Sequence, residues 1–271
     1  MSVYVGERDV VLVEGEEATT YLQGQISQDV DQLAPGDSAW SLILQPQGKV
    51  DAWFRITRTG SDAYLLDVDT GFGETLLARL KRFKLRTKAD LELLTWTLHA
   101  YDGEPTADVD APIVAPSATG TGTDVIGPEL GDPAGEVATA EEYLRRRILA
   151  GVPAMGSELD DSTIPAEAGV VDRSVSFTKG CYTGQELVAR VDSRGNNTPR
   201  KLRIVTGSGS ATPGDELTID DAAVGVLTSV ATSDDDFVAL GYIKRSAFDA
   251  NEVDLGGRSV AVRPVPADET S

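Results

Sequence analysis

The single cysteine of the chain is its most conspicuous candidate for chemistry. Cys181 lies between Gly180 and Gly184, follows Lys179 by two positions, and precedes a helix that we predict to begin near Gln185. The thiolate is the reactive form of cysteine, and both a neighbouring ammonium group and the positive end of a helix favour it. A small, buried and inert thiol is the alternative, because lone cysteines are often buried. The residues alone leave both alternatives open.

Other reactive residue types are scarce. The chain of 271 residues contains one histidine, His99, and one cysteine. This composition disfavours a metal cage built from histidines and a Ser-His triad, and it excludes an internal disulfide. We therefore expect no resident metal ion.

The charge balance is strongly acidic. Asp and Glu number 44 against 24 Lys and Arg, giving a net charge of −20 and a pI near 4.3. Such a surface, with 17 Arg but only 7 Lys, is typical of a halophilic protein, which stays soluble when salt screens charge repulsion. An ordinary acidic protein is the alternative. The charge also disfavours direct binding of duplex nucleic acid, although Lys81, Arg82, Lys84, Arg86 and Lys88 form a local basic cluster.

The composition is that of a globular protein, with 41% hydrophobic and 25% charged residues. No apolar run reaches the length of about 18 residues that a transmembrane helix needs. The first residues lack the basic-then-apolar pattern of a secretion signal. These observations predict a cytoplasmic protein with no membrane partner.

Hydrophobic periodicity predicts a mixture of helices and strands before residue 199. Apolar residues at helical spacing, such as Phe72, Leu76 and Leu80, predict helices, and residues 139–142 form a capping box before another. The proline-rich stretch 102–136 is either a long loop or several short strands. The predicted strands are residues 10–13, 39–44, 50–57, 63–68 and 91–98. The predicted helices are residues 16–26, residues 143–149, one helix that begins after Thr70 and one that begins after Gly184.

Beyond residue 200 the pattern changes to short β runs separated by glycine-containing turns. Pro213-Gly214 and Gly256-Gly257 mark two of these turns. The pattern predicts a small all-β module over residues 200–271, most simply a barrel. We therefore expect two regions, residues 1–199 with mixed helices and strands and residues 200–271 with the β-barrel.

The segment around the cysteine closely resembles the Lys-Gly-Cys-Tyr-x-Gly-Gln-Glu signature of the YgfZ-type folate-binding proteins, which belong to the superfamily of the glycine-cleavage aminomethyltransferase. Elements of the same family resemble residues 21–30, 47–49, 147–153, 164–169 and 194–197, so the resemblance covers most of the chain. The matching signature residues are Lys179, Gly180, Cys181, Tyr182, Gly184, Gln185 and Glu186.

The resemblance implies an α+β fold in which three modules form a cloverleaf around a central folate channel. Residues 1–199 would form two interleaved α+β modules, and residues 200–271 the C-terminal β-barrel module. It implies that the chain binds tetrahydrofolate or a one-carbon derivative and supports iron–sulfur cluster assembly or repair, including for enzymes that modify tRNA. The expected partners are reduced folate and iron–sulfur client proteins or assembly factors.

The resemblance also assigns roles to residues. Cys181 would be the reactive thiol, with Lys179 as its electrostatic partner or as a folate contact. The residues that would line the folate site are Lys179, Gly180, Tyr182, Gly184, Gln185, Glu186 and Arg190.

The chain departs from the aminomethyltransferase at two positions that matter for catalysis. The transferase carries two adjacent aspartates after its glycine turn, whereas here Asp51 is the one carboxylate and the remaining catalytic candidate. The glutamate that holds the pterin in the transferase is replaced by Leu149. Proton transfer at a folate nitrogen needs a carboxylate, so the weakened set favours binding over turnover and leaves enzyme activity open.

A folate-dependent aminomethyltransferase is the alternative function. An iron–sulfur scaffold and a pure interaction adaptor are further alternatives, although one cysteine cannot supply the four thiolates that a typical cluster needs.

Overall fold

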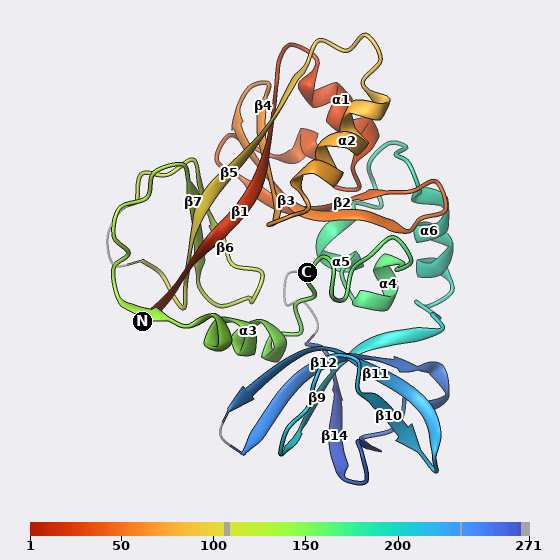
Figure 1. Cartoon of the computed structure of the whole chain (residues 1–271). Helices are drawn as coiled ribbons and strands as arrows, with labels where there is room; N and C mark the ends of the chain where they lie inside the picture. The colour runs from red at the N-terminus through yellow and green to blue at the C-terminus, as the bar shows by residue number, and fades with distance from the viewer. Residues whose placement is uncertain (106–108, 234, 267–271) are drawn as a thin grey trace.

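The structure is a computed structural model that describes residues 1–105, 109–233 and 235–266 of the chain. Figure 1 shows a large sheet with flanking helices above, and a separate β-barrel below. Helices and strands are both present and occur in largely separate layers, so the predicted α+β fold class is confirmed.

An eight-stranded sheet organises the first half of the chain, in the order β2-β3-β4-β1-β5-β7-β6 with β8 paired in parallel to β1. The other neighbouring strands pair antiparallel. The strands are β1 (Ser2–Glu14), β2 (Ser38–Leu44), β3 (Val50–Gly60), β4 (Ala63–Asp69), β5 (Asp90–Tyr101), β6 (Ile113–Pro116), β7 (Thr123–Gly127) and β8 (Glu136–Ala138). The stretch 102–136 therefore contains short strands, which was one of its two predicted forms.

Two helices and a short 3-10 helix lie beside this sheet. They are α1 (Ala18–Gln25), α2 (Gly73–Phe83) and η1 (Val30–Gln32). The apolar side chains of α1 and α2, such as Leu22, Leu76 and Leu80, are buried with those of the strands in the largest hydrophobic core. Burial of these side chains holds both helices to the sheet.

A buried set of ion pairs crosses the sheet. The Arg55 guanidinium contacts Asp67 at 2.9 Å and Asp124 at 3.0 Å. Arg8 on β1 contacts Asp67 at 3.1 Å and also pairs with Asp69. These charges are tolerated inside the protein because each has a partner.

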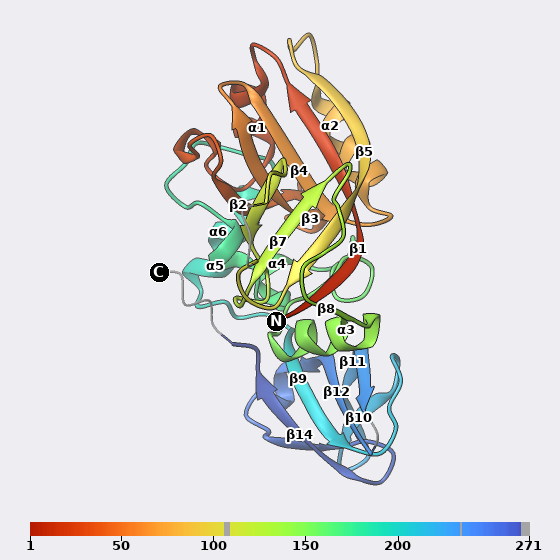
Figure 2. The same cartoon turned by 90° about the vertical axis from the view of Figure 1, so that its left-hand side faces the viewer.

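Four helices connect the sheet to the barrel: α3 (Ala140–Leu149), α4 (Pro165–Ala168), α5 (Val171–Ser174) and α6 (Gln185–Ser193). The predicted capping box begins α3, because the Thr139 hydroxyl accepts a hydrogen bond from the Glu142 N–H and the Glu142 carboxylate accepts one from the Thr139 N–H. In both views α3 lies between the barrel and the sheet (Figures 1 and 2).

A closed barrel forms the last part of the chain, in the order β10-β11-β12-β9-β14-β13. Its elements are β9 (Arg200–Ser208), β10 (Glu216–Ile219), β11 (Ala222–Ser233), β12 (Asp236–Lys244), the 3-10 helix η2 (Arg245–Ala247), β13 (Glu252–Asp254) and β14 (Ser259–Pro264). The division at residue 199 stays a prediction. Of the region predicted as 200–271, residues 234 and 267–271 lie outside the described residues, as do residues 106–108 of the proline-rich stretch.

A buried glutamate ties the barrel to the segment that follows α3. The Glu158 carboxylate accepts hydrogen bonds from Ser229 at 2.6 Å, Thr228 at 2.7 Å and the Ala154 N–H at 2.9 Å. It also lies 3.2 Å from the Arg147 guanidinium. These contacts join α3, the following loop and β11 at one point.

Within the described part of the chain, no helix has the length and apolar character that crossing a membrane requires.

Candidate functional site

The segment 177–190, here called the signature segment, is held in place by its lysine. The Lys179 side chain is buried and its ammonium group donates hydrogen bonds to the carbonyl oxygens of Ile26 at 2.8 Å and Gln28 at 2.6 Å. The same ammonium lies 5.4 Å from the centre of the Tyr182 ring. Lys179 therefore fixes the signature segment to the end of α1.

Burial also changes the ionisation of this lysine. Loss of hydration lowers the pKa of Lys179 to about 8, while the carboxylates of Asp29 and Asp31 act in the opposite direction. The lysine therefore keeps its proton at neutral pH but loses it at a lower pH than a lysine in water does.

Cys181 is exposed, so the buried alternative is wrong for this thiol, and its predicted reactivity stays a prediction. The helix predicted after it is α6, which begins at Gln185 as expected. Gly184 caps this helix with a φ of +84°, and an added Cβ would lie 2.7 Å from the Gln45 carbonyl oxygen and 2.8 Å from the Leu44 Cβ. Glycine is required there by both the backbone conformation and the space.

The remaining signature side chains divide into buried and exposed groups. Tyr182 is buried, its hydroxyl has no hydrogen-bond partner among the described residues, and burial raises its pKa to about 12. Gln185 is half-buried, whereas Gly180, Glu186 and Arg190 are exposed. The roles predicted for these residues in folate binding stay predictions.

The structure brings the signature segment together with the turn at residues 45–49, which the sequence linked only through a shared family resemblance. A Cβ at Gly48, where φ is +70°, would lie 2.7 Å from the Leu187 Cβ on α6. The close approach of these two backbones therefore requires glycine on both sides, at Gly48 and at Gly184.

Asp51, the other catalytic candidate, lies in a different environment. Its carboxylate accepts a hydrogen bond from the Arg79 Nε at 2.8 Å. It lines a cavity of about 540 Å³ between α2 and the turn at residues 45–49, and Cys181 does not line this cavity. Its predicted catalytic role stays a prediction.

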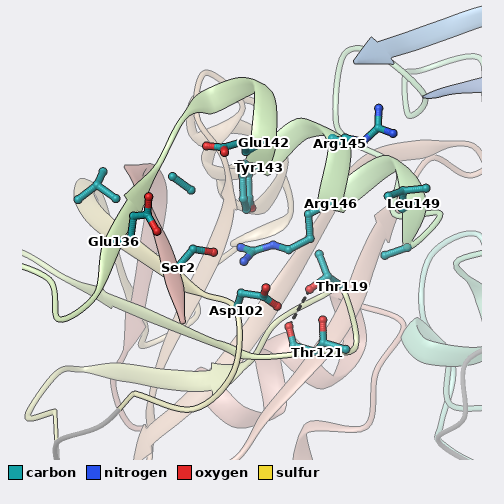
Figure 3. Close-up of a pocket in the computed structure, with 13 residues that line it drawn as sticks. Ser2, Asp102, Thr119, Thr121, Glu136, Glu142, Tyr143, Arg145, Arg146 and Leu149 are labelled. Carbon is teal, nitrogen blue, oxygen red and sulfur yellow. Dashed lines mark hydrogen bonds between the residues drawn. The ribbon is translucent and has the colours of Figure 1, made fainter. Parts of the chain in front are cut away.

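A second large cavity, of about 560 Å³, lies beneath α3 (Figure 3). Its residues come from the N-terminus, the ends of β5 and β8, the turn at residues 117–122, and α3. The lining residues are Ser2, Asp102, Thr119, Thr121, Glu136, Val137, Ala138, Glu142, Tyr143, Arg145, Arg146, Leu149 and Ala150.

Arg146 is the principal cation of this cavity. Figure 3 shows its side chain extending from α3 toward Ser2 and Asp102. Its Nη2 donates to the Ala100 carbonyl at 3.1 Å, and its guanidinium lies 5.3 Å from the centre of the Tyr143 ring. Its Nε is buried and has no partner among the residues that the structure describes. A donor of this kind suits an anionic or carbonyl oxygen of a ligand.

The sequence did not indicate this cavity as a whole, because its lining residues lie far apart in the chain, between Ser2 and Ala150. One signal was present: Leu149, which occupies the position of the pterin-binding glutamate in the aminomethyltransferase, is among its lining residues. No residue of the signature segment lines it.

No group of three or more His, Cys, Asp or Glu side chains within residues 1–105, 109–233 and 235–266 is arranged to hold a metal ion.

Comparisons with known proteins identify relatives and a fold. A scan against models of protein families finds no match. The chain is 31% identical over 218 residues to a protein of Mycosarcoma maydis named as a mitochondrial homologue of the iron–sulfur cluster assembly factor IBA57, with 70% of this chain and 53% of that protein covered. It is 28% identical over 243 residues to the tRNA-modifying protein YgfZ of Vibrio atlanticus, with 81% and 74% covered. The chain thus spans about half the length of the fungal relative.

A solved structure has the same fold. The aminomethyltransferase T of the glycine cleavage system from Bartonella henselae superposes with a TM-score of 0.76 at 18% identity, covering 96% of this chain and 84% of that one. The chain therefore has the aminomethyltransferase fold. These relatives and this fold confirm the resemblance to the YgfZ-type proteins of the aminomethyltransferase superfamily that the sequence analysis describes.

Proposed function

We propose that this chain binds a reduced folate, tetrahydrofolate or a one-carbon derivative, and supports the assembly or repair of iron–sulfur clusters in client proteins, including enzymes that modify tRNA. The names of its relatives, an iron–sulfur cluster assembly factor and a tRNA-modifying protein, support this class of function. The observation that carries the proposal is the exposed Cys181, which is the only thiol and lies on a segment anchored by a buried lysine.

Cys181 acts as the reactive group in this proposal. An exposed thiol at the approach to α6 is accessible to a client protein or an assembly factor. A single thiol does not enclose a cluster by itself, so we assign it to contact with a partner or to transient ligation rather than to a resident cluster. The cytoplasm remains the predicted location.

The reduced folate occupies the cavity beneath α3. The cavity volume of about 560 Å³ lies in the range of small-molecule sites, roughly 300–1,000 Å³. Leu149 stands at the position of the transferase's pterin-binding glutamate, and Arg146, whose buried Nε has no partner among the described residues, lines the same cavity. The aromatic pair of Tyr4 and Tyr143, stacked at 4.3 Å, holds the α3 side of the cavity in place.

Aminomethyl transfer is less favoured by the same geometry. Asp51 is engaged by Arg79, and Leu149 lacks the carboxylate that would hold the pterin. Release of ammonia from an aminomethyl-lipoyl carrier, dependent on tetrahydrofolate, is the result that would favour the transferase.

Calorimetric titration with tetrahydrofolate and its methylene and formyl forms tests the folate proposal. We expect binding by the native chain and a loss of about tenfold or more in affinity for Leu149→Trp, because the indole fills part of the cavity. Leu149 is 40% exposed, so this change does not overpack the core, and Leu85→Trp at an 83% exposed site is the matched control.

The location of the folate is tested with the same titration of Arg190→Gln, at an exposed residue of the signature segment. If Arg190→Gln abolishes binding and Leu149→Trp does not, the ligand contacts the signature segment, as the sequence predicts. Absence of binding to every reduced folate by the folded native chain would refute the folate proposal altogether.

The iron–sulfur role is tested in cells that lack this chain. We expect the native chain to restore the activity of an iron–sulfur enzyme and Cys181→Ser to fail, while Cys181→Ser retains folding and folate binding. Thr183→Ser, a similar change two positions away, is the matched control. Full restoration by Cys181→Ser would show that the thiol has no such role.

A further inference from the structure

The cavity beside α2 is separate from the proposed folate cavity. It is lined by residues of the turn at residues 45–49 and of α2, including Gln45, Gln47, Asp51, Arg79, Arg82 and Phe83. Neither the signature segment nor the α3 cavity contributes a residue to it. Figure 1 shows α2 beside the sheet and far from the barrel.

A buried guanidinium in this cavity has a donor without a partner. Arg79 is 8% exposed, its Nε binds Asp51 and its Nη2 donates to the Leu44 carbonyl at 2.9 Å. Its Nη1 is buried and has no hydrogen-bond partner among the described residues. Guanidinium donors bind carboxylate oxygens well, and a buried donor left unpaired is costly. An oxyanion that reached Nη1 from the cavity would satisfy it.

The surface around this donor is basic on an otherwise acidic protein. Between Glu74 and Asp90 the chain has no acidic residue and carries six of its 24 Lys and Arg. Asp51 neutralises Arg79, and Lys88 pairs with Glu16 at 2.9 Å. The other four side chains have no ion-pair partner within the described part of the chain. They are Lys81, Arg82, Lys84 and Arg86.

Two apolar side chains lie within this basic surface. Phe83 is 40% exposed and Leu85 is 83% exposed. A partner that fits both features carries carboxylates together with aliphatic groups, which is the chemistry of an acidic protein segment. With a net charge of −20, the rest of the chain repels such a segment, so its approach is directed to α2.

The aromatic ring favours a protein over a nucleic acid as the partner. Single-stranded nucleic acids are held largely by stacking of their bases on exposed aromatic rings. Here the Arg79 guanidinium lies 4.1 Å from the centre of the Phe83 ring, and that of Arg82 lies 5.7 Å from it. The guanidinium of Arg79 covers the ring, and Leu85 offers no stacking surface.

We propose that the surface formed by α2 and residues 84–86 binds an acidic, leucine-containing segment of a partner protein, with one carboxylate of that segment received by Arg79 Nη1 and Arg82. Leu85 and the exposed edge of Phe83 pack against its aliphatic side chains. The ion pair with Asp51 positions the Arg79 guanidinium for this contact.

Fluorescence anisotropy tests this surface with a labelled peptide of Glu with interspersed Leu residues, and with labelled oligo-Glu and oligouridylate as separate arms. The titrations use the full chain at the lowest salt at which its circular dichroism is that of the folded state. We expect the Glu/Leu peptide to bind most tightly and added potassium chloride to weaken it. Tighter binding of oligouridylate, or no binding of the Glu/Leu peptide, overturns the proposal.

Surface variants separate the two contributions. Arg82→Glu reverses an exposed charge on this surface, and we expect a loss of about tenfold or more in affinity. Arg194→Glu, the same change at an exposed site outside it, leaves the affinity within about twofold. Leu85→Ser weakens binding of the Glu/Leu peptide but not binding of oligo-Glu. Equal effects of Arg82→Glu and Arg194→Glu, or no effect of Leu85→Ser, contradict the proposed surface.

Discussion

The buried ammonium group of Lys179 makes the free energy of unfolding depend on pH. Its pKa is lowered by burial from 10.5 to about 8 in the folded protein, so in the unfolded chain the lysine keeps its proton to higher pH. Between these two values the unfolded state binds more protons, and the free energy of unfolding must rise with pH. Below about pH 8 both states are protonated and this contribution is constant.

We therefore expect the native chain to gain stability from pH 8 to 9.5 and Lys179→Met to lack this gain. The gain is at most about 2 kcal/mol, because each pKa unit is worth about 1.4 kcal/mol. Urea unfolding at closely spaced pH values measures it, and Lys201→Met, at a less buried lysine, is the control. A slope that survives in Lys179→Met would assign the pH dependence to other groups.

Residue types and spacing predicted part of this site. The helix that begins at Gln185 follows from local sequence, whereas an exposed Cys181 was one of two alternatives that the residues left open. The partners of Lys179 do not, because the carbonyls of Ile26 and Gln28 lie about 150 positions earlier in the chain. No local pattern contains that pairing, since it depends on where α1 ends in the folded protein.

At the level of elements, the point where α3, the loop after it and the barrel meet depends on Glu158. Its carboxylate is 1% exposed and paired with Arg147. Glu158→Gln keeps the shape but leaves the guanidinium without its counter-charge, so we expect a loss of about 2–4 kcal/mol in the free energy of unfolding.

Equilibrium unfolding in urea at constant salt measures this loss. Glu141→Gln is the matched control, because Glu141 also joins α3 to β11, through the Thr232 N–H at 2.6 Å, but is exposed. We expect less than about 1 kcal/mol for Glu141→Gln. A similar small loss for Glu158→Gln would mean that water replaces the ion pair at that position.

Strand β1 shows why some elements were predicted only in part. The apolar residues 10–13 predicted a short strand, whereas β1 runs from Ser2–Glu14. The first half of β1 was not predicted because it carries charged residues, among them Arg8 and Asp9. Both have partners inside the protein. Arg8 pairs with Asp67, and Asp9 accepts hydrogen bonds from the N–H groups of Gly71 and Gly73. A charged residue can be assigned to a central strand only when its distant partners are known.

The whole molecule combines an ordinary core with a strongly charged surface. The aminomethyltransferase fold places the apolar residues of the sheet, the connecting helices and the barrel in contact. Its buried ion pairs, such as that of Arg55 with Asp67, are shielded from salt by their surroundings. Dissolved salt therefore acts mainly on the net charge of −20 at the surface.

From this charge we expect the thermal midpoint to rise as potassium chloride increases from dilute buffer, because screening relieves repulsion that the unfolded chain feels less. The rise should level off near about 1 M, where the screening length is about 3 Å. Sodium chloride should act equally at equal ionic strength. A midpoint that does not change, or one that rises only in sulfate through its exclusion from the protein surface, would contradict a halophilic origin of the acidic surface.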